Sequence, residues 1–466
     1  MIRKALLILL CSLTSIISAQ HIQNHQLESG TSRGLGSGES FNPFKSRRND
    51  STKVDVKVPK EIKQWRIEEE LGDPISIDAD TAQFMFQNWH LTEGVRGEYN
   101  FLGSMGTPRQ SRIFFDRPTD TKYDFLQPYD YFYTTPKRFI FTDTKSPYTN
   151  LSYHSSGDKV EGDDRVRAYF TTNAGKHFGV GFLFDYLYAR GRYDNQASAL
   201  MNFTLFSFYR SDRYNYHLIA SRYHMKQAEN GGITDDRYIT RPEETDGSNS
   251  NFGTTDIPVK LDKTWNRNEV YNVYFSHNYN MGFYRDEVVK DSNGVATDSL
   301  ERKFVKVSRI THTLKMTRDM REFINYIPPT NYYADTFLPY DSVDQTISTT
   351  IENKVALSLC KGFSKWAFAD ITAFASYSYN NYTLPDTIAG KGTEYKRKYN
   401  EHILKIGGTI SGNIWKDMKY HIEGETAISG DEIGTFSLDG KAELNLKLWK
   451  KEIKLTAHAF AKNNRP

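Results

Sequence analysis

The side chains that could do chemistry in this sequence are spread out and do not form a catalytic motif. There is no Gly-x-Ser-x-Gly turn to expose a nucleophilic serine and no His-Glu-x-x-His pair to hold zinc. The twelve histidines are scattered, and five of them fall within predicted strands: His154, His217, His277, His312 and His421. We therefore expect no enzymatic activity, no catalytic residue, no metal and no cofactor.

Two local clusters of charge allow other chemistry. Asp158, Glu161, Asp163 and Asp164 could hold Ca²⁺, although a solvated loop is the expectation. The stretch Tyr395–Tyr399 is basic with flanking aromatics, which could bind nucleic acid, lipopolysaccharide phosphate or a charged solute. A solvated loop is again the expectation, and with 60 basic against 57 acidic residues we expect no nucleic-acid partner.

Charged residues inside predicted strands carry more information. A charge facing lipid near the middle of a membrane costs roughly 2–4 kcal/mol. Charges in strands with lipid-facing spacing should therefore face a lumen or lie near a rim. Because the net charge of the chain is only +3, the sequence does not show whether the lumen prefers anions or cations. The candidate lumen or rim charges are Arg167, Asp185, Arg222, Lys306, Lys315, Asp370 and Lys405.

The elements that position these charges are strands, because apolar and polar residues alternate from about Pro147 onwards. In Phe178–Ala189 the aromatic and branched residues occupy every second position, and Asp185 lies in the opposite set. A dozen or more such segments follow, many about ten residues long, the length of a tilted membrane-crossing strand. Short and long connections tend to alternate, which favours an all-β, antiparallel up-and-down transmembrane β-barrel over a soluble sheet with one wet face. The number of strands after Pro147 comes out odd, whereas bacterial barrels tend to an even number.

Composition and the N-terminus agree with export to a membrane. Hydrophobic residues make up 38% and aromatics 14% of the chain, which suits a barrel with a polar lumen and aromatic girdles. Residues 1–19 read as a signal peptide cleaved near Ala19, with a membrane anchor or lipidation at Cys11 as alternatives. We expect a flexible polar tail at 20–59, a segment at 60–146 that is periplasmic, plug-like or part of the first strands, and a barrel at 147–466.

The chain carries five short motifs between residues 71 and 196: Leu71-Gly72, Asp80-Thr81, Leu102–Pro108, Ser146–Tyr153 and Gly191–Gln196. Together they resemble the putative porin family of Bacteroidetes-type bacteria, and this resemblance implies a large outer-membrane barrel without naming its substrate. One departure is the end of the chain at Pro466, where outer-membrane barrels usually carry a terminal aromatic. We expect either a truncated piece of a longer protein or completion of the wall by strands from 60–146.

The expected function is a porin-like channel for passive diffusion of small hydrophilic solutes in a Gram-negative outer membrane. The alternative is a non-conducting barrel with a structural or ligand-binding role, or a component of an uptake complex. Outer-membrane lipid, lipopolysaccharide and the barrel-assembly machinery are the expected partners, and the oligomeric state stays open. Asp or Arg at Phe182 or Phe184 should impair assembly, whereas substitution of Asp185 should be tolerated.

Overall fold

The computed structural model describes residues 62–78, 92–94, 97–117, 123–157, 161–245, 253–290, 296–327, 332–333, 343–364, 367–387, 394–414, 418–448 and 451–464. The signal peptide predicted at 1–19 and the tail predicted at 20–59 lie outside these residues. All of the described residues belong to one compact unit, 57–466.

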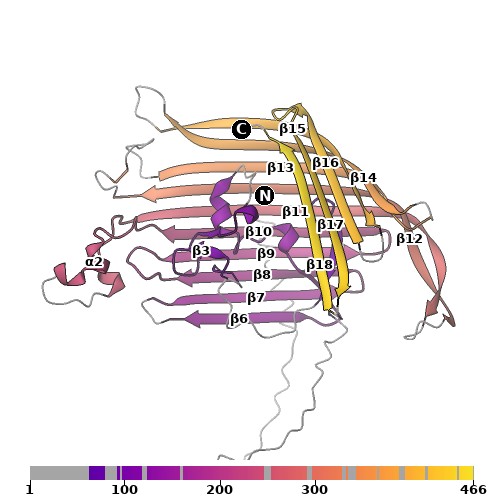
Figure 1. Cartoon of the computed structure of the whole chain (residues 1–466), viewed down its shortest axis with the longest axis horizontal. Helices are drawn as coiled ribbons and strands as arrows, with labels where there is room; N and C mark the ends of the chain where they lie inside the picture. Colours follow the sequence, from indigo (N-terminus) through magenta and orange to yellow (C-terminus); the bar gives the residue numbers. More distant parts are fainter. Residues whose placement is uncertain are drawn as a thin grey trace, which may run out of the picture. The chain divides into compact units, whose positions relative to one another are not determined.

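The main sheet contains thirteen antiparallel strands in chain order, each paired with the next (Figure 1). The predicted all-β, antiparallel up-and-down order of strands is confirmed, and among the described residues β6 and β18 form the two edges of the sheet. The strands are β6 (Tyr148–Ser156), β7 (Asp163–Ala174), β8 (Phe178–Ala189), β9 (Ser198–Arg210), β10 (Tyr214–Ala228), β11 (Thr264–Lys290), β12 (Ala296–Asn325), β13 (Val343–Leu359), β14 (Ala369–Thr387), β15 (Glu394–Asn413), β16 (Met418–Gly430), β17 (Phe436–Leu448) and β18 (Lys451–Asn463).

The connections differ between the two ends of the sheet. At one end β7–β8 and β9–β10 are joined by residues 175–177 and 211–213, whereas at the other end 229–263 and 326–342 join β10–β11 and β12–β13. Strands β11 and β12 extend past their neighbours at the short-connection end, where residues 282–306 pair only with each other among the described residues.

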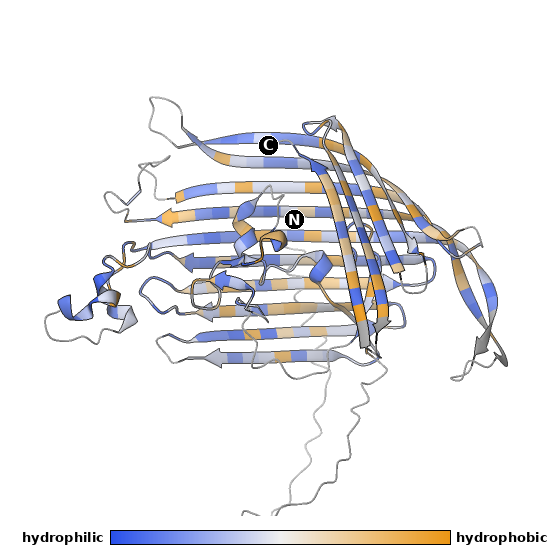
Figure 2. Cartoon of the chain, viewed as in Figure 1, coloured by the Kyte–Doolittle hydropathy of each residue, from blue (hydrophilic) through white to orange (hydrophobic). Residues whose placement is uncertain are grey.

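The two faces of the sheet differ because side chains alternate along each strand. In β8, Phe182 is 36% exposed while its neighbour Leu183 is 5% exposed. Polar and apolar residues alternate in the same way along the other strands (Figure 2). An apolar band therefore covers the outward face. Its exposed members include Val180, Phe203, Leu205, Ile310, Met316, Val355, Leu357, Ile371, Ile406 and Ile410.

Residues N-terminal to the main sheet pack against its inward face. Strands β1 (Ile62–Ile67), β2 (Pro74–Ile77) and β5 (Phe141–Thr144) form a small sheet in the order β2-β1-β5. Trp65 and Phe141 share a buried cluster with Phe206, Phe208 and other inward residues of β7–β11. The inward face of this part of the sheet is therefore covered by protein. The domain boundaries predicted from the sequence stay predictions.

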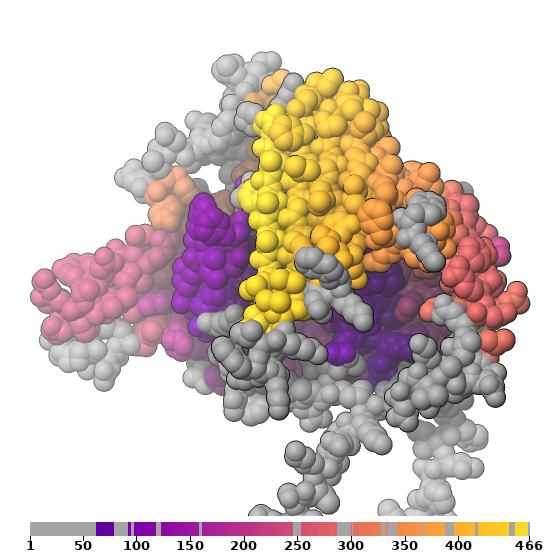
Figure 3. Space-filling view, turned by 45° about the vertical axis from the view of Figure 1, so that its right-hand side comes forward, coloured from indigo at the N-terminus to yellow at the C-terminus, as the bar shows by residue number. Residues whose placement is uncertain are grey.

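A second buried cluster holds the remainder of the segment. Met105 and Tyr129 pack with Leu187, Leu200 and Tyr223 of the wall. The segment also contains β3 (Tyr99–Phe101), β4 (Arg109–Ser111) and the short 3-10 helices η1 (Phe114–Asp116), η2 (Asp124–Tyr129) and η3 (Pro136–Arg138). In Figure 3 residues of this indigo segment are visible in a hollow beneath the yellow C-terminal strands.

Among the described residues, helical structure is otherwise confined to the long connection between β10 and β11. It contains α2 (Arg237–Thr240), η4 (Pro242–Glu244) and η5 (Thr254–Asp256). Within the described ranges, helices that are long and apolar enough to cross a membrane are absent.

Candidate functional site: a charged turn on the inward face

The turn between β1 and β2, residues Glu68–Asp73, is the most highly charged part of the N-terminal segment. Its shape is fixed by Glu68, whose carboxylate accepts hydrogen bonds from the backbone N–H groups of Glu70 (3.0 Å) and Leu71 (2.7 Å). The Gly72 N–H donates to the Glu68 carbonyl at 2.8 Å. We call this element, Glu68–Asp73, the acidic turn.

Gly72 lets the acidic turn lie directly against β11. Its φ of +68° is left-handed, a conformation that favours glycine. A Cβ at this position would also overlap the side chain of Ser276. Two independent constraints therefore require glycine here.

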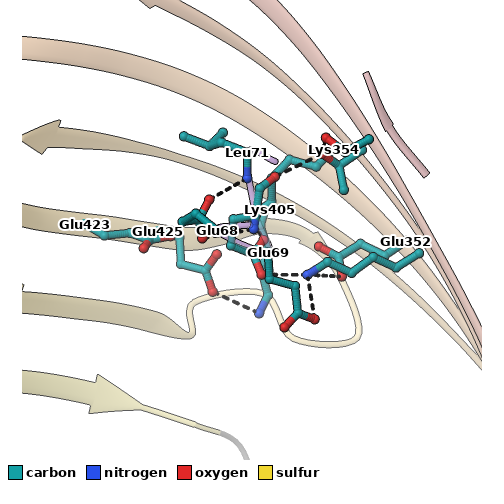
Figure 4. A network of polar contacts seen from close by, with 12 residues as sticks. Glu68, Glu69, Leu71, Glu352, Lys354, Lys405, Glu423 and Glu425 are labelled. Carbon is teal, nitrogen blue, oxygen red and sulfur yellow. Dashed lines mark hydrogen bonds and ion pairs between the residues drawn. The ribbon is translucent and has the colours of Figure 1, made fainter. Parts of the chain in front are cut away.

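Glu70 joins the acidic turn to two lysines of the wall. Its carboxylate lies 2.6 Å from the Lys315 ammonium and also pairs with Lys354. Lys315 lies 3.7 Å from Glu69 and 3.8 Å from Glu352, so two lysines face three carboxylates. Figure 4 shows the labelled carboxylates of turn and wall around Lys354 and Lys405.

The acidic turn is also held by contacts that do not depend on Glu70. Asp73 binds Arg309 through both carboxylate oxygens, one of them at 2.8 Å. The hydroxyl groups of Tyr274 and Thr313 each donate at 3.0 Å to the backbone carbonyls of Glu69 and Glu70 respectively. Leu71 packs with Ala356 and Phe374 in a small apolar cluster.

The ion pairs and burial shift the pKa values of the two glutamates in opposite directions. Burial alone would raise the pKa of Glu70, but Lys315 and Lys354 outweigh it and lower that pKa from 4.5 to about 2. Burial raises the pKa of Glu68, and its backbone hydrogen bonds only partly oppose this shift. Glu70 is therefore ionised in its pocket at any physiological pH.

Two cavities lie beside the acidic turn along β12–β18. The first, of about 680 Å³, is lined by the turn, the β11–β12 pair and the short-connection ends of β13 and β14. The second, of about 420 Å³, is lined by polar and charged side chains of β13–β18 and by Glu70. This part of the inward face is open and polar, unlike the face of β7–β11 that the segment covers.

Four of the charges singled out from the sequence lie at this open side. Lys315 pairs with Glu70, and Lys306 and Asp370 line the first cavity. Asp370 also lies 3.6 Å from Lys361. Lys405 lines the second cavity, 3.4 Å from both Glu425 and Glu432.

Two further candidates, Asp185 and Arg167, are paired with each other away from the cavities. Asp185 is 6% exposed and binds Arg165 at 2.6 Å, with Arg167 at 3.7 Å. A buried carboxylate that compensates two arginines is more costly to replace than the sequence suggests, since its loss leaves their charge unpaired.

Arg222 lies on the outward face. Its guanidinium pairs with Glu269 at 2.7 Å, stacks over the Tyr271 ring, and its side chain is 51% exposed. The alternation along one strand cannot predict the ion pair with Glu269, because Glu269 lies on the neighbouring strand.

The acidic turn was not among the sites predicted from the sequence. Three consecutive glutamates before Leu71-Gly72-Asp73-Pro74 were a usable signal, since a carboxylate run at a turn needs cationic partners. The lysines and Arg309 that supply them lie more than two hundred residues away.

Other residues singled out from the sequence have partners elsewhere in the fold. His217 accepts a hydrogen bond from the Trp65 indole at 3.1 Å, and Asp164 pairs with Arg190 at 2.9 Å. Asp158 of the acidic cluster lies outside the described residues. Among residues that are described, no group of three or more His, Cys, Asp or Glu side chains could hold a metal ion.

Solved structures similar to this chain include receptors of the outer membrane. The open form of the ferric-catecholate import receptor Fiu from E. coli has a TM-score of 0.36 and 8% identity, and the match covers 71% of this chain and 62% of that chain. Its closed form has a TM-score of 0.35 and 10% identity, with 71% of this chain and 60% of that chain covered. A mutant of the ferric enterobactin receptor PfeA from Pseudomonas aeruginosa has a TM-score of 0.39 and 9% identity, with 66% of this chain and 45% of that chain covered. The chain thus spans less than two thirds of the length of these receptors. No curated protein matches the sequence.

The family comparison covers almost all of the described structure. The model of the family described as "Putative porin" matches residues 61–466, which include the N-terminal segment as well as every strand of the main sheet. The predicted origin in Bacteroidetes-type bacteria stays a prediction. By this match and by its fold, the chain is an outer-membrane β-barrel that belongs to the putative porin family.

Proposed function

We propose that this protein is a porin-like channel for passive diffusion of small hydrophilic solutes across a Gram-negative outer membrane. The observation that supports this function best is the pair of cavities along the inward face of β12–β18, both of which are lined in part by charged side chains. Lipid offers no partners for polar groups, so a barrel places its apolar residues outward and can line its interior with charge.

The proposed route is narrower than the bore of an empty barrel. Trp65, Phe139 and Phe141 pack tightly with Phe206 and Phe208, which leaves little room for solute on that side. Solutes would pass along the opposite side, where paired carboxylates and lysines can exchange hydrogen bonds with water and solute. Selectivity would come from these charges.

The channel needs no catalytic residue, metal or cofactor, and we propose none. Its partners would be outer-membrane lipid, lipopolysaccharide, the barrel-assembly machinery and the solutes themselves. Residues 1–19 would direct export and be cleaved near Ala19.

A second candidate is a non-conducting barrel with a structural or ligand-binding role, or a component of an uptake complex. The observation that favours it is the docking of the acidic turn, which is fixed by ion pairs to Lys315, Lys354 and Arg309. A turn held this firmly could occlude the lumen.

Single-channel conductance of the refolded full-length protein in a planar bilayer distinguishes the two candidates. The channel predicts stepwise currents, smaller than those of an unobstructed barrel with the same number of strands. A salt gradient would give the sign of selectivity from the reversal potential. A folded, heat-modifiable barrel that gives no steps would exclude the channel and favour the second candidate.

A further inference from the structure

The two cavities beside the acidic turn meet at a small set of shared residues. Glu70, Lys354 and Glu423 line both the first and the second cavity. These three side chains come from the acidic turn, β13 and β16, so they enclose the boundary from different directions.

Strand register shows that the cavities follow one another along the barrel. Ser358, Thr372 and Thr409 are successive partners across β13–β15 and line the first cavity. Lys354, Ser376 and Lys405 form a row four residues away along β13 and line the second. The first cavity includes Cys360–Gly362 at the short-connection end, and the second therefore lies further toward the long connections.

The charges at the boundary do not balance. Lys354 is buried and pairs with Glu70, whose side chain is 32% exposed. Glu423 is 28% exposed, and its carboxylate lies 3.7 Å from a nitrogen of His421. Lys315 also pairs with Glu70 and lies near Glu69 and Glu352. The boundary and its ion-pair partners therefore hold four carboxylates and two ammonium groups, which leaves a net negative charge even when His421 is protonated.

We propose that Glu70, Lys354 and Glu423 form the constriction of the channel and make it prefer cations over anions of similar size. The inference rests on the proposed function, since a constriction has a role only if solute passes from one cavity to the other. A charge at a narrow, partly desolvated point acts more strongly on a passing ion than the same charge at a wide mouth.

The first test is the reversal potential of single channels in a KCl gradient. Glu423→Gln is the main variant, because Glu423 is partly exposed and its loss leaves the Glu70–Lys354 pair intact. Glu269→Gln is the matched control: it removes the same charge from an outward-facing position, where Glu269 pairs with Arg222. We expect Glu423→Gln to lower the ratio of cation to anion permeability by about twofold or more, and the control to leave it unchanged.

A second test is chemical and does not use the reversal potential. Glu423→Cys is placed in a background without the native thiols (Cys11→Ser, Cys360→Ser), because Cys360 lines the first cavity. A positively charged methanethiosulfonate reagent added to open channels should reduce the current. Glu269→Cys in the same background should show no such loss.

The outcomes separate the two proposals. Conducting channels in which Glu423→Gln keeps wild-type selectivity and the Glu423→Cys current resists the reagent would overturn the constriction while leaving the channel intact. Folded wild-type barrels that never conduct would overturn the proposed function, and the constriction with it.

Discussion

At the scale of single residues, Glu70 links the acidic turn to the wall through its ion pairs with Lys315 and Lys354. Lys354 is 4% exposed and has its carboxylate partner in Glu70, which comes from a different part of the chain. Removing one member of a buried pair costs more than the pair contributes, because the other charge is left uncompensated.

Replacing Glu70 by Gln should weaken docking of the acidic turn in a pH-dependent way. The pKa of Glu70 is lower in the docked state than its ordinary 4.5, so its contribution is present above pH 4.5 and is lost as the pH falls toward about 2. We expect a loss of about 2 kcal/mol at pH 6, below the usual 3–5 kcal/mol because Lys315 keeps other carboxylates. Hydrogen exchange of residues 62–67 at pH 6 and pH 3 measures it.

Burial raises the pKa of Glu68 in both proteins, so this contribution cancels in the difference between wild type and Glu70→Gln. The difference therefore reports the charge of Glu70, including its effect on Glu68. Asp235→Asn, which removes an exposed ion pair with Arg237 in the β10–β11 connection, is the control and should leave the protection of residues 62–67 unchanged. A difference between Glu70→Gln and wild type that does not vary with pH would contradict this account.

Gly72→Ala should loosen the acidic turn through both strain and overlap. We expect a cost of roughly 2–3 kcal/mol, of which about 1 kcal/mol comes from the positive φ. Gly175→Ala provides the comparison, because Gly175 has a φ of +76° and open space around its Cβ. Protease protection of the segment should be partly restored in Gly72→Ala/Ser276→Gly, and no restoration would show that overlap with Ser276 is unimportant.

At the scale of elements, each wall strand separates lipid from interior by its two faces. In β8 the outward face carries Phe182 and Tyr186, while Asp185 and Leu187 face inward. The same alternation in β13 puts Val355 and Leu357 outward and Lys354 and Ala356 inward. The same charged substitution should therefore have very different effects at two adjacent positions of one strand.

Phe182→Arg should impair barrel assembly, since an outward arginine near the middle of the membrane costs about 2–4 kcal/mol. Ser378→Arg is the control: it places the same side chain in the wall of the polar second cavity, where it should be tolerated. The measurement is the fraction of heat-modifiable barrel after refolding into lipid vesicles. Equal assembly of the two variants would show that the outward face of β8 does not meet lipid.

The strands and their faces could be predicted from the sequence, because period-two alternation is a local property. Phe182 and Asp185 fall on opposite faces as their spacing requires. The acidic turn could not be located in the same way. Its partners Lys315, Lys354 and Arg309 become neighbours of Glu70 and Asp73 only when the sheet curves, and a single sequence does not show that curvature. Arg222 shows the same limit, since its compensation by Glu269 depends on strand register.

At the scale of the whole molecule, the N-terminal segment and the wall share their apolar cores. Two buried clusters contain side chains from both, and a third joins Leu71 to β13 and β14. Elements that share a core usually unfold together. The segment should therefore behave as part of the barrel.

Unfolding in denaturant should remove protection from β1 and from β8–β10 in a single transition. Hydrogen exchange followed by mass spectrometry at increasing urea measures residues 62–67 and 178–228 in the same sample. Trp65→Ala, which removes the largest side chain of the first cluster, should lower both midpoints together, with a cost of about 3–5 kcal/mol. Loss of β1 at a lower urea concentration, with the wall still protected, would instead identify a segment that undocks independently.

The contacts of the acidic turn also constrain the order of events during biogenesis. The turn touches β11, β12 and β13 at once, and Trp65 reaches β9 and β10. A segment held on so many sides must reach its place before the sheet finishes curving around it. It also precedes those strands in the chain, so during synthesis and export it is available first. The N-terminal segment would then act as an internal template around which the later strands assemble.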